Sequence, residues 1–287
     1  MIRQLTIFGV GLIGGSLALA LKKAGYCKEV VGCSRSAKHL QRAVDLGVID
    51  RYTLDPAEAV KGADMILLAV PLGAMQTVFE NIADHIEDGA IITDAGSAKG
   101  SVVAAAKAAF GDVPAQFVPG HPIAGREKSS VEAAIADLYI DHKIILTPLE
   151  NTSADALKKV RDMWEVVGAE VEILEVGKHD AVLAATSHLP HILAFSFVNS
   201  LAESAVSDEV FHYIAGGFKD FSRIASSDPV MWRDICLENK PAVLTALDDF
   251  QQNLADLADL IIEEDGDALL DAFLHAKIVR DKYVNKE

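Results

Sequence analysis

The chain has 287 residues, of which 51% are hydrophobic and 24% are charged. This balance is typical of a globular protein with room for about two domains, and it excludes a disordered chain. The formal net charge of −16 repels nucleic acid and anionic membrane surfaces, so we expect neither as a partner. Three cysteines without a C-x-x-C spacing predict no disulfide framework and favour the reducing cytoplasm.

The first part of the chain alternates β-rich runs with helical patterns, which is typical of βαβ units in a parallel sheet. Strands are predicted at residues 5–10, 30–34, 65–70, 91–94, 117–120, 144–147 and 171–174. Helices are predicted at residues 15–24, 37–46, 74–85, 98–110 and 154–167. Glycines interrupt the apolar N-terminal run, which argues against a signal peptide or membrane anchor.

The strand signal ends near Glu175, and apolar-periodic helical patterns follow at residues 181–205, 242–264 and 268–283. The sequence therefore predicts two domains, a mostly parallel α/β domain over residues 1–175 and an all-helical domain over residues 176–287. A helical domain rich in Leu, Ile, Val and Phe usually buries one face on a partner subunit. We therefore expect dimerisation of two identical chains through this domain.

The residues Gly9-Val10-Gly11-Leu12-Ile13-Gly14 follow a predicted strand and open a predicted helix. A G-x-G-x-x-G in this context predicts a Rossmann-type dinucleotide site. The first glycine permits a tight turn, the second lets the backbone approach a pyrophosphate, and the third allows close packing of helix on strand. The helix N-terminus adds hydrogen-bond donors and positive potential. The residues expected to contact the cofactor here and after a later strand are Gly9, Gly11, Leu12, Ile13, Gly14, Val70 and Pro71.

The end of the second strand indicates which dinucleotide is bound. NAD-binding domains of this type usually carry an Asp or Glu there, about twenty residues beyond the glycines. Here the strand ends in Ser34-Arg35-Ser36 without a carboxylate. An arginine and two hydroxyls suit a 2′-phosphate, so the sequence favours NADP over NAD. Alternatively, Arg35 stacks on the adenine or faces solvent, and the protein uses NAD or both cofactors.

Ligands of an open α/β sheet bind outside the carboxyl ends of its strands. Two unusual loops are expected there, at residues 94–99 and at residues 121–128, the second of which opens with His-Pro. Further motifs are Thr-Ser-His-Leu-Pro-His at residues 186–191 and Gly-Gly-Phe-Lys-Asp-Phe-Ser-Arg at residues 216–223, ahead of Trp232. From the glycine motif to Trp232, this ordered set resembles the prephenate and arogenate dehydrogenase family of tyrosine biosynthesis. Its members oxidatively decarboxylate prephenate to 4-hydroxyphenylpyruvate, or arogenate to tyrosine, using NAD(P).

The resemblance implies a role for three residues. His121 would take the proton of the ring hydroxyl as hydride leaves the same carbon, a task that suits an unprotonated imidazole. Ser97 would orient the hydroxyl or the nicotinamide, although its position is also that of an N-cap for the helix near Ala98. Arg223 would grip a substrate carboxylate through its planar donor pair, with a surface ion pair as the alternative.

The resemblance also implies weaker assignments around the substrate. His191 is similar to the second substrate-side histidine of the family, and Trp232 stands where a tryptophan borders the active site. Lys219 would add positive charge, or lie on an exposed helical turn. Arg126 stands where family members vary, and an extra cation there would favour prephenate, which lacks the amino group of arogenate.

His179 and His188 are expected in pocket or packing positions and not around a metal ion. His188 and His191 straddle Pro190 and lack a Cys or carboxylate at ligand spacing. Pro190 is instead predicted to kink its helix.

Two other readings remain open at this point. A β-hydroxyacid dehydrogenase or imine reductase also joins such a nucleotide-binding domain to a helical one, but the Lys/Asn pair of the hydroxyacid enzymes is not apparent here. A non-catalytic sensor that binds NADP would need only the glycine loop and the helical packing, and it would leave His121, Ser97 and Arg223 unexplained.

Overall fold

The computed structural model describes residues 1–126 and 130–284. Its chain forms two compact units, Met1–Lys240 and Pro241–Glu287.

The main sheet of the first unit has six parallel strands in the order β3-β2-β1-β4-β5-β6. The strands are β1 Ile2–Phe8, β2 Cys27–Cys33, β3 Arg51–Thr53, β4 Met65–Leu68, β5 Ile91–Asp94 and β6 Phe117–Val118. This is the strand order of the Rossmann-type fold, so the predicted fold class is confirmed. The order reverses between β1 and β4, and ligands of such sheets bind at this point.

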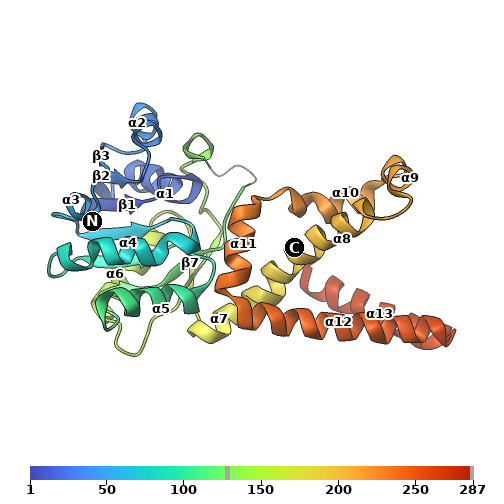
Figure 1. Ribbon diagram of the computed structural model, residues 1–287. Helices are drawn as coiled ribbons and strands as arrows, with labels where there is room; N and C mark the ends of the chain where they lie inside the picture. Colours follow the sequence, from blue (N-terminus) through green and yellow to red (C-terminus); the bar gives the residue numbers. More distant parts are fainter. Residues whose placement is uncertain (127–129, 285–287) are drawn as a thin grey trace. The chain divides into compact units, whose positions relative to one another are not determined.

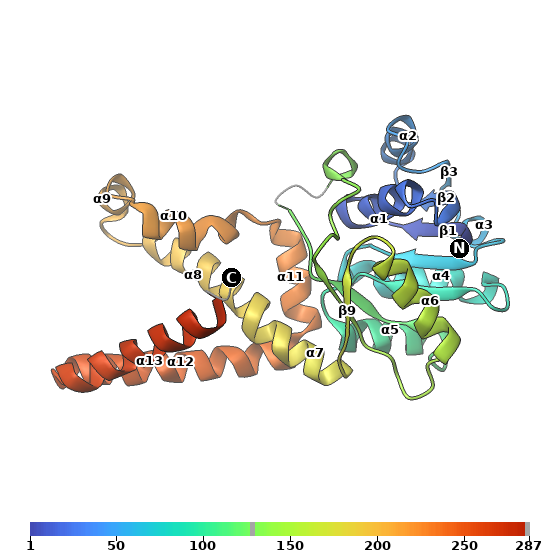
Figure 2. The same ribbon diagram turned by 180° about the vertical axis from the view of Figure 1, so that it is seen from behind.

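Helices cover both faces of the main sheet, as the apolar runs of its strands require. The helices are α1 Leu12–Lys23, α2 Ala37–Asp45, α3 Pro56–Ala59, α4 Met75–Ile82, α5 Lys99–Phe110 and α6 Ala154–Glu165. One buried cluster joins α1, α2 and α6, for example through Leu17, Leu40 and Val160. The other joins α3, α4 and α5, for example through Phe79 and Val102. Accordingly, α4 and α5 lie in front in Figure 1 and α6 lies in front in Figure 2.

A second sheet of three strands follows the first, in the order β7-β8-β9. Its strands are β7 Gly120–Pro122, β8 Lys143–Leu146 and β9 Glu170–Ile173. The prediction of one strand over residues 117–120 followed by a loop at His121 is therefore wrong. The main sheet ends at Val118, and His121 lies in β7, opposite Ile145 of β8 in antiparallel pairing. Since β7 is an edge strand, it tolerates Pro122, which has no backbone N–H to donate.

The remainder of the first unit is helical. Its elements are α7 Val176–Leu183, η4 Ala184–His188, α8 Leu189–Ala202, α9 Ser207–His212, α10 Gly216–Ser222, η5 Arg223–Ser226 and α11 Pro229–Glu238. The disturbance predicted at Pro190 takes the form of a π-helical turn, η4, directly before the helix that begins with Leu189 and Pro190. Val176–Ala202 is long and apolar enough to cross a membrane by length and composition, and 22% of its most apolar window is buried within the chain. Most residues of that window are therefore not fully buried in a single chain.

The second unit contains two long helices, α12 Lys240–Ile262 and α13 Gly266–Val284. Between them Glu264 adopts a left-handed conformation with φ of 52°, and the Asp265 side chain accepts a hydrogen bond from the Ala268 N–H at 2.9 Å. Several large apolar side chains of these helices are more than half exposed, namely Leu254, Ile261, Ile262, Leu270, Phe273 and Ile278.

Candidate functional site

The glycine turn after β1 is closely packed against the loop after β4. Gly9 has φ of +89°, a conformation that strains any residue with a side chain. A Cβ atom on Gly9 would lie 2.4 Å from the carbonyl oxygen of Ala69, and one on Gly14 would lie 2.6 Å from the carbonyl oxygen of Gly9. The same loop carries Val70, whose Cγ1 atom would lie 3.1 Å from a Cβ atom on Gly9. Pro71 follows it. The two loops predicted to hold the cofactor therefore lie side by side.

The N-terminus of α1 is available to a phosphate group. The helix begins at Leu12 instead of the predicted residue 15, with Gly11 as its N-cap. No side chain caps the first turn, so its N–H groups can meet a ligand. The Ile13 carbonyl accepts a hydrogen bond from the Tyr139 hydroxyl at 2.6 Å, which helps to fix this turn. The backbone here fits the pyrophosphate of a dinucleotide.

The end of β2 leads into α2 through Ser34, Arg35 and Ser36. The Ser36 hydroxyl caps α2 by accepting the His39 N–H at 3.3 Å, and the His39 ring donates through Nε2 to the Val10 carbonyl at 2.8 Å. Arg35 is exposed. A surface hollow of about 640 Å³ lies beside this turn, lined by Ser36, Lys38, His39, Gln41, Arg42, Asp45 and Glu132.

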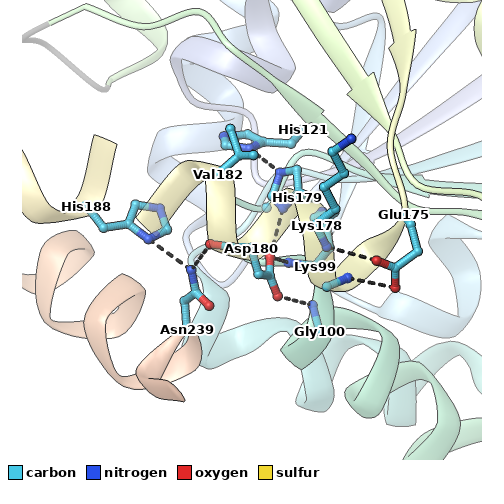
Figure 3. Close-up of polar contacts among 12 residues, drawn as sticks. Lys99, Gly100, His121, Glu175, Lys178, His179, Asp180, Val182, His188 and Asn239 are labelled. Carbon is cyan, nitrogen blue, oxygen red and sulfur yellow. Dashed lines mark hydrogen bonds and ion pairs between the residues drawn. The ribbon is translucent and has the colours of Figure 1, made fainter. Parts of the chain in front are cut away.

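His121 lies at the carboxyl-end side of the sheet and is buried, with 8% of its surface exposed. Its Nδ1 atom is 2.9 Å from Nε2 of His179 on α7 (Figure 3). The two rings meet edge to face, with centroids 5.1 Å apart. Among the described residues, none is hydrogen-bonded to Nε2 of His121. That nitrogen is therefore available to a bound molecule.

A buried carboxylate stands behind this pair of histidines. Nδ1 of His179 is 2.8 Å from a carboxylate oxygen of Asp180. The same carboxylate accepts the N–H groups of Lys99 and Gly100, each at 2.8 Å. Burial alone would raise the pKa of Asp180, but these hydrogen bonds outweigh it and the pKa lies below its ordinary value. Asp180 is thus an ionised cap on the N-terminus of α5.

Lys99 is buried with no exposed surface, and its ammonium forms an ion pair with Asp94, the last residue of β5. It also donates to the Gly120 carbonyl at 2.6 Å, directly before His121. Asp94 accepts the Gly96 and Gly120 N–H groups at 2.7 and 3.1 Å. This network fixes the strand that carries His121.

The surroundings keep the His121 ring neutral. Burial lowers its pKa well below the ordinary value, and the charge of Lys99 and the neighbouring rings of His179 and His188 lower it further. At physiological pH the ring therefore has an unprotonated nitrogen, as a general base requires.

Ser97 lies in the loop between β5 and α5 and is half-buried. The alternative in which it caps the following helix is wrong, because the N-cap is Ala98 and the cap is supplied by Asp180 from α7. Within residues 1–126 and 130–284, the Ser97 hydroxyl has no hydrogen-bond partner, so it is free to orient a ligand.

A second group of rings gathers on η4, α8 and α11. Asn239 donates to the Asp180 carbonyl at 2.9 Å and lies 3.1 Å from Nδ1 of His188. His188 is buried, and burial lowers its pKa to about 4. Its ring faces Trp232 edge to face, with centroids 6.1 Å apart. His191 stacks on the same indole, with centroids 3.6 Å apart.

Arg223, at the start of η5, lies near the His191 ring. Burial lowers the pKa of His191, the hydrogen bond of its Nδ1 to the Ser187 carbonyl opposes this, and the charge of Arg223 lowers it further. The structure therefore brings His191, Trp232 and Arg223 together. A series of contacts through His188, Asn239, Asp180 and His179 joins this group to His121.

Two predicted substrate residues are exposed. Lys219 lies on α10, one turn before Arg223, and Arg126 follows β7 as the last described residue before 130. Their roles stay predictions. Across the described ranges 1–126 and 130–284, no three His, Cys, Asp or Glu side chains are grouped so that they could hold a metal ion.

Several residues of this site were not identified from the sequence, namely Asp94, Lys99, Asp180 and Asn239, and His179 was assigned only to pocket or packing. Their contacts span up to 81 residues along the chain. A His-Asp pair on the buried side of a helix is the signal that could have indicated part of the network.

The chain is similar to known proteins along most of its length. Residues 17–173 match the family model "Prephenate dehydrogenase, nucleotide-binding domain", and residues 175–275 match "Prephenate dehydrogenase, dimerization domain". The chain is 39% identical to a cyclohexadienyl dehydrogenase of Zymomonas mobilis, over 97% of this chain and 95% of that protein. It is 37% identical to a prephenate dehydrogenase of Bacillus subtilis, over 95% and 74% of the two chains.

A solved structure gives the same result. The prephenate dehydrogenase of Aquifex aeolicus in complex with hydroxyphenyl propionate and NAD⁺ matches with a TM-score of 0.93 and 38% identity, over 98% of each chain. The fold, the glycine turn and the histidine network thus occur in a chain that aligns with such enzymes along nearly its whole length. The chain belongs to the prephenate dehydrogenase family.

Proposed function

We propose that this protein catalyses the oxidative decarboxylation of prephenate to 4-hydroxyphenylpyruvate, or of arogenate to tyrosine, with NAD(P)⁺ as the oxidant. The observation that carries the proposal is the state of His121. One of its ring nitrogens is engaged by His179 at 2.9 Å, the other has no partner among the described residues, and the pKa of the ring is low. The names of the relatives, cyclohexadienyl and prephenate dehydrogenase, support the substrate class.

In this mechanism His121 accepts the proton of the ring hydroxyl as hydride leaves the carbon that carries it. The nicotinamide cofactor, when bound at the glycine turn, supplies the hydride acceptor. The bond between the ring and its carboxylate then breaks, CO₂ leaves, and the electron pair aromatises the ring. His121 returns its proton to the oxygen, which becomes the phenol hydroxyl, so that no proton is gained or lost overall. Ser97 orients the hydroxyl or the nicotinamide.

The anionic substrate needs positive charge inside a chain of net charge −16. Arg223 is our candidate for the substrate carboxylate, with His191 and Trp232 beside it. Lys219 and Arg126 are weaker candidates, and Arg126 is the residue that we expect to favour prephenate over arogenate.

For the cofactor we propose NADP over NAD. The support is the end of β2, where Ser34, Arg35 and Ser36 stand without a carboxylate and Arg35 is exposed. Gly9, Gly11, Leu12, Ile13 and Gly14 would hold the pyrophosphate, with Val70 and Pro71 on the facing loop.

We further propose that the protein is a homodimer that buries the apolar surfaces of Val176–Ala202 and of α12 and α13. The support is the match of residues 175–275 to a dimerisation domain and the exposure of large apolar side chains such as Ile262 and Phe273. The domain boundary between residues 175 and 176 stays a prediction, supported by family models that cover residues 17–173 and 175–275. Light scattering should give the mass of two chains, against 30.7 kDa for one.

The test of the proposed function is a spectrophotometric assay that crosses prephenate and arogenate with NAD⁺ and NADP⁺. We expect reduced cofactor with at least one substrate, and a loss of roughly 10²- to 10⁴-fold in kcat for His121→Asn. Turnover of neither substrate by the wild-type protein, or wild-type turnover by His121→Asn, would overturn the proposal. The exposed His85 supplies the control variant, His85→Asn, which should keep wild-type activity.

A further inference from the structure

We propose that His179 and Asp180 are positioning residues that hold His121 in the tautomer with its proton on Nδ1 and its lone pair on Nε2. The inference rests on the proposed function for its kinetic consequences, but the tautomer itself is a property of the free protein.

The charge of Asp180 decides which atom donates in each hydrogen bond between Asp180, His179 and His121. An ionised carboxylate can only accept hydrogen bonds, so its contact at 2.8 Å requires a proton on Nδ1 of His179. A neutral His179 then has its lone pair on Nε2. The contact of this nitrogen with Nδ1 of His121, at 2.9 Å, requires that His121 be the donor. In a neutral His121 the remaining nitrogen, Nε2, is therefore the base.

The reverse arrangement would make His179 an imidazolium that donates to His121. Such a cation would be buried close to the Lys99 ammonium, which is fully buried as well. The ion pair of Lys99 is with Asp94, so Asp180 would be left to compensate the second charge while it also caps α5. Each cation would then face one carboxylate, but the desolvation of a second buried cation commonly exceeds the Coulombic attraction that it gains.

The same two hydrogen bonds stabilise the protonated form of His121. When His121 accepts a proton on Nε2, its Nδ1–H still donates to His179, and the charge of Asp180 acts through that ring. The titratable groups that act on His121 are Lys99 on α5, His179 on α7 and His188 on η4, and Lys99 opposes protonation. Asp180 lies on the far side of the His179 ring, against its Nδ1. Asp180 is therefore the carboxylate that favours the imidazolium, as the aspartate of a Ser-His-Asp triad does for its histidine.

The arrangement is visible in Figure 3, where Asp180 lies between His179 and the N-terminus of α5. Glu175, also drawn there, offers a matched control. Its carboxylate caps α7 by accepting the Gly177 and Lys178 N–H groups at 3.0 and 2.9 Å, and no hydrogen bond joins it to any imidazole of the described chain.

The experiment combines nitrogen NMR with kinetics on Asp180→Asn, His179→Gln, His179→Leu and Glu175→Gln. In the ¹⁵N-labelled wild-type protein without ligands, we expect His121 to show a protonated Nδ1 and an unprotonated Nε2. His179→Leu and Asp180→Asn should give a mixture of tautomers. His179→Gln should keep the wild-type tautomer, because its amide oxygen can accept from Nδ1.

In the kinetic arm, we expect kcat/KM to fall by roughly 10²-fold or more in Asp180→Asn, with a larger effect on kcat than on the KM for the cofactor. The acid limb of the pH profile should move to lower pH, because the protonated base loses its carboxylate. A merely structural role would lower activity without moving this limb. Glu175→Gln should leave both the tautomer and the limb unchanged.

A proton on Nε2 of His121 in the wild-type protein would overturn the inference, and so would a wild-type tautomer in both Asp180→Asn and His179→Leu. If Asp180→Asn does not fold because α5 loses its cap, the pair of His179 variants decides alone. Failure of the wild-type protein to oxidise either substrate would reject the proposed function and leave the NMR result to decide the tautomer.

Discussion

Lys99 and Asp94 form an ion pair in which neither side chain has any exposed surface. Lys99 begins α5 and Asp94 ends β5, and the ammonium also holds the carbonyl of Gly120 in β7. The pair thus fixes the strand that carries the base, and it places the Lys99 ammonium where its charge acts on that base.

We expect Lys99→Met to destabilise the protein by about 3–5 kcal/mol, because it leaves the Asp94 carboxylate buried without its partner. Urea unfolding followed by circular dichroism measures the change. Lys158→Met serves as the control, since Lys158 pairs with Asp162 on the exposed face of α6 and its loss should change stability little. Equal effects of the two substitutions would contradict the assigned importance of the buried pair.

Substitution of Arg223 should act on substrate binding. We expect Arg223→Gln to raise the KM for prephenate by roughly 10- to 100-fold, the value of a lost charge-assisted contact to a carboxylate, with a smaller effect on kcat. Arg223→Lys should recover only part of the loss, because an ammonium lacks the paired donors. Initial-rate kinetics decide, with Arg161→Gln on α6 as the control for a lost surface cation. An unchanged KM in Arg223→Gln would reject the carboxylate contact.

Substitution of Arg35 should act on the cofactor alone. If this guanidinium binds the 2′-phosphate, Arg35→Ser should raise the KM for NADP⁺ by about 10-fold or more and leave the KM for NAD⁺ unchanged. Arg3→Ser is the control, because Arg3 lies near the amino end of β1 and pairs with Asp64. A wild-type preference for NAD⁺, or equal changes for both cofactors, would remove the argument for NADP.

The burial of His188 should make stability depend on pH. Its pKa is about 4 in the folded protein, against an ordinary value of 6.5. Above pH 6.5 the His188 ring is neutral in both the folded and the unfolded protein, and the stability is full. As the pH falls, the ring takes up a proton in the unfolded protein first, so the free energy of unfolding decreases. Between pH 7 and pH 5 this amounts to about 2 kcal/mol.

The urea midpoints of unfolding at pH 7 and pH 5 measure this loss. His188→Gln should reduce the loss, whereas His85→Gln, at an exposed histidine, should leave it unchanged. If His188→Gln lost as much stability as the wild type over the same range, the buried neutral ring would not be the cause.

The local patterns were sufficient for the nucleotide-binding fold. The strand predicted at residues 91–94 coincides with β5, and the glycine motif correctly marked the first turn. β3 was missed because Arg51–Thr53 is too short to show the alternation of apolar and polar residues that marks a strand. β7 was read as a loop because Pro122 argues against a strand, and only the long-range partner Ile145 shows that the segment is an edge.

The site followed the same rule. His121 was identified through a motif, and its environment was not, because Lys99, His179 and Asp180 meet it only through the packing of α7 against α5. The residues of such a side-chain network do not follow one another at a characteristic spacing in the sequence. The chemistry of single residues was therefore predictable, while the proton positions that govern it required the tertiary structure.

The π-helical turn at Ala184–His188 has a geometric consequence for the rings beyond it. A π turn holds about one residue more than an α-helical turn, so it absorbs an extra residue without changing the rotational phase of the helix beyond it. α8 therefore sets His191 against Trp232 although the segment before it is about one residue longer than a regular α-helix would hold. An extra residue within the α-helical turns of α7 would have the opposite effect, because every later side chain, the His191 imidazole included, would turn by about 100° around the helix axis.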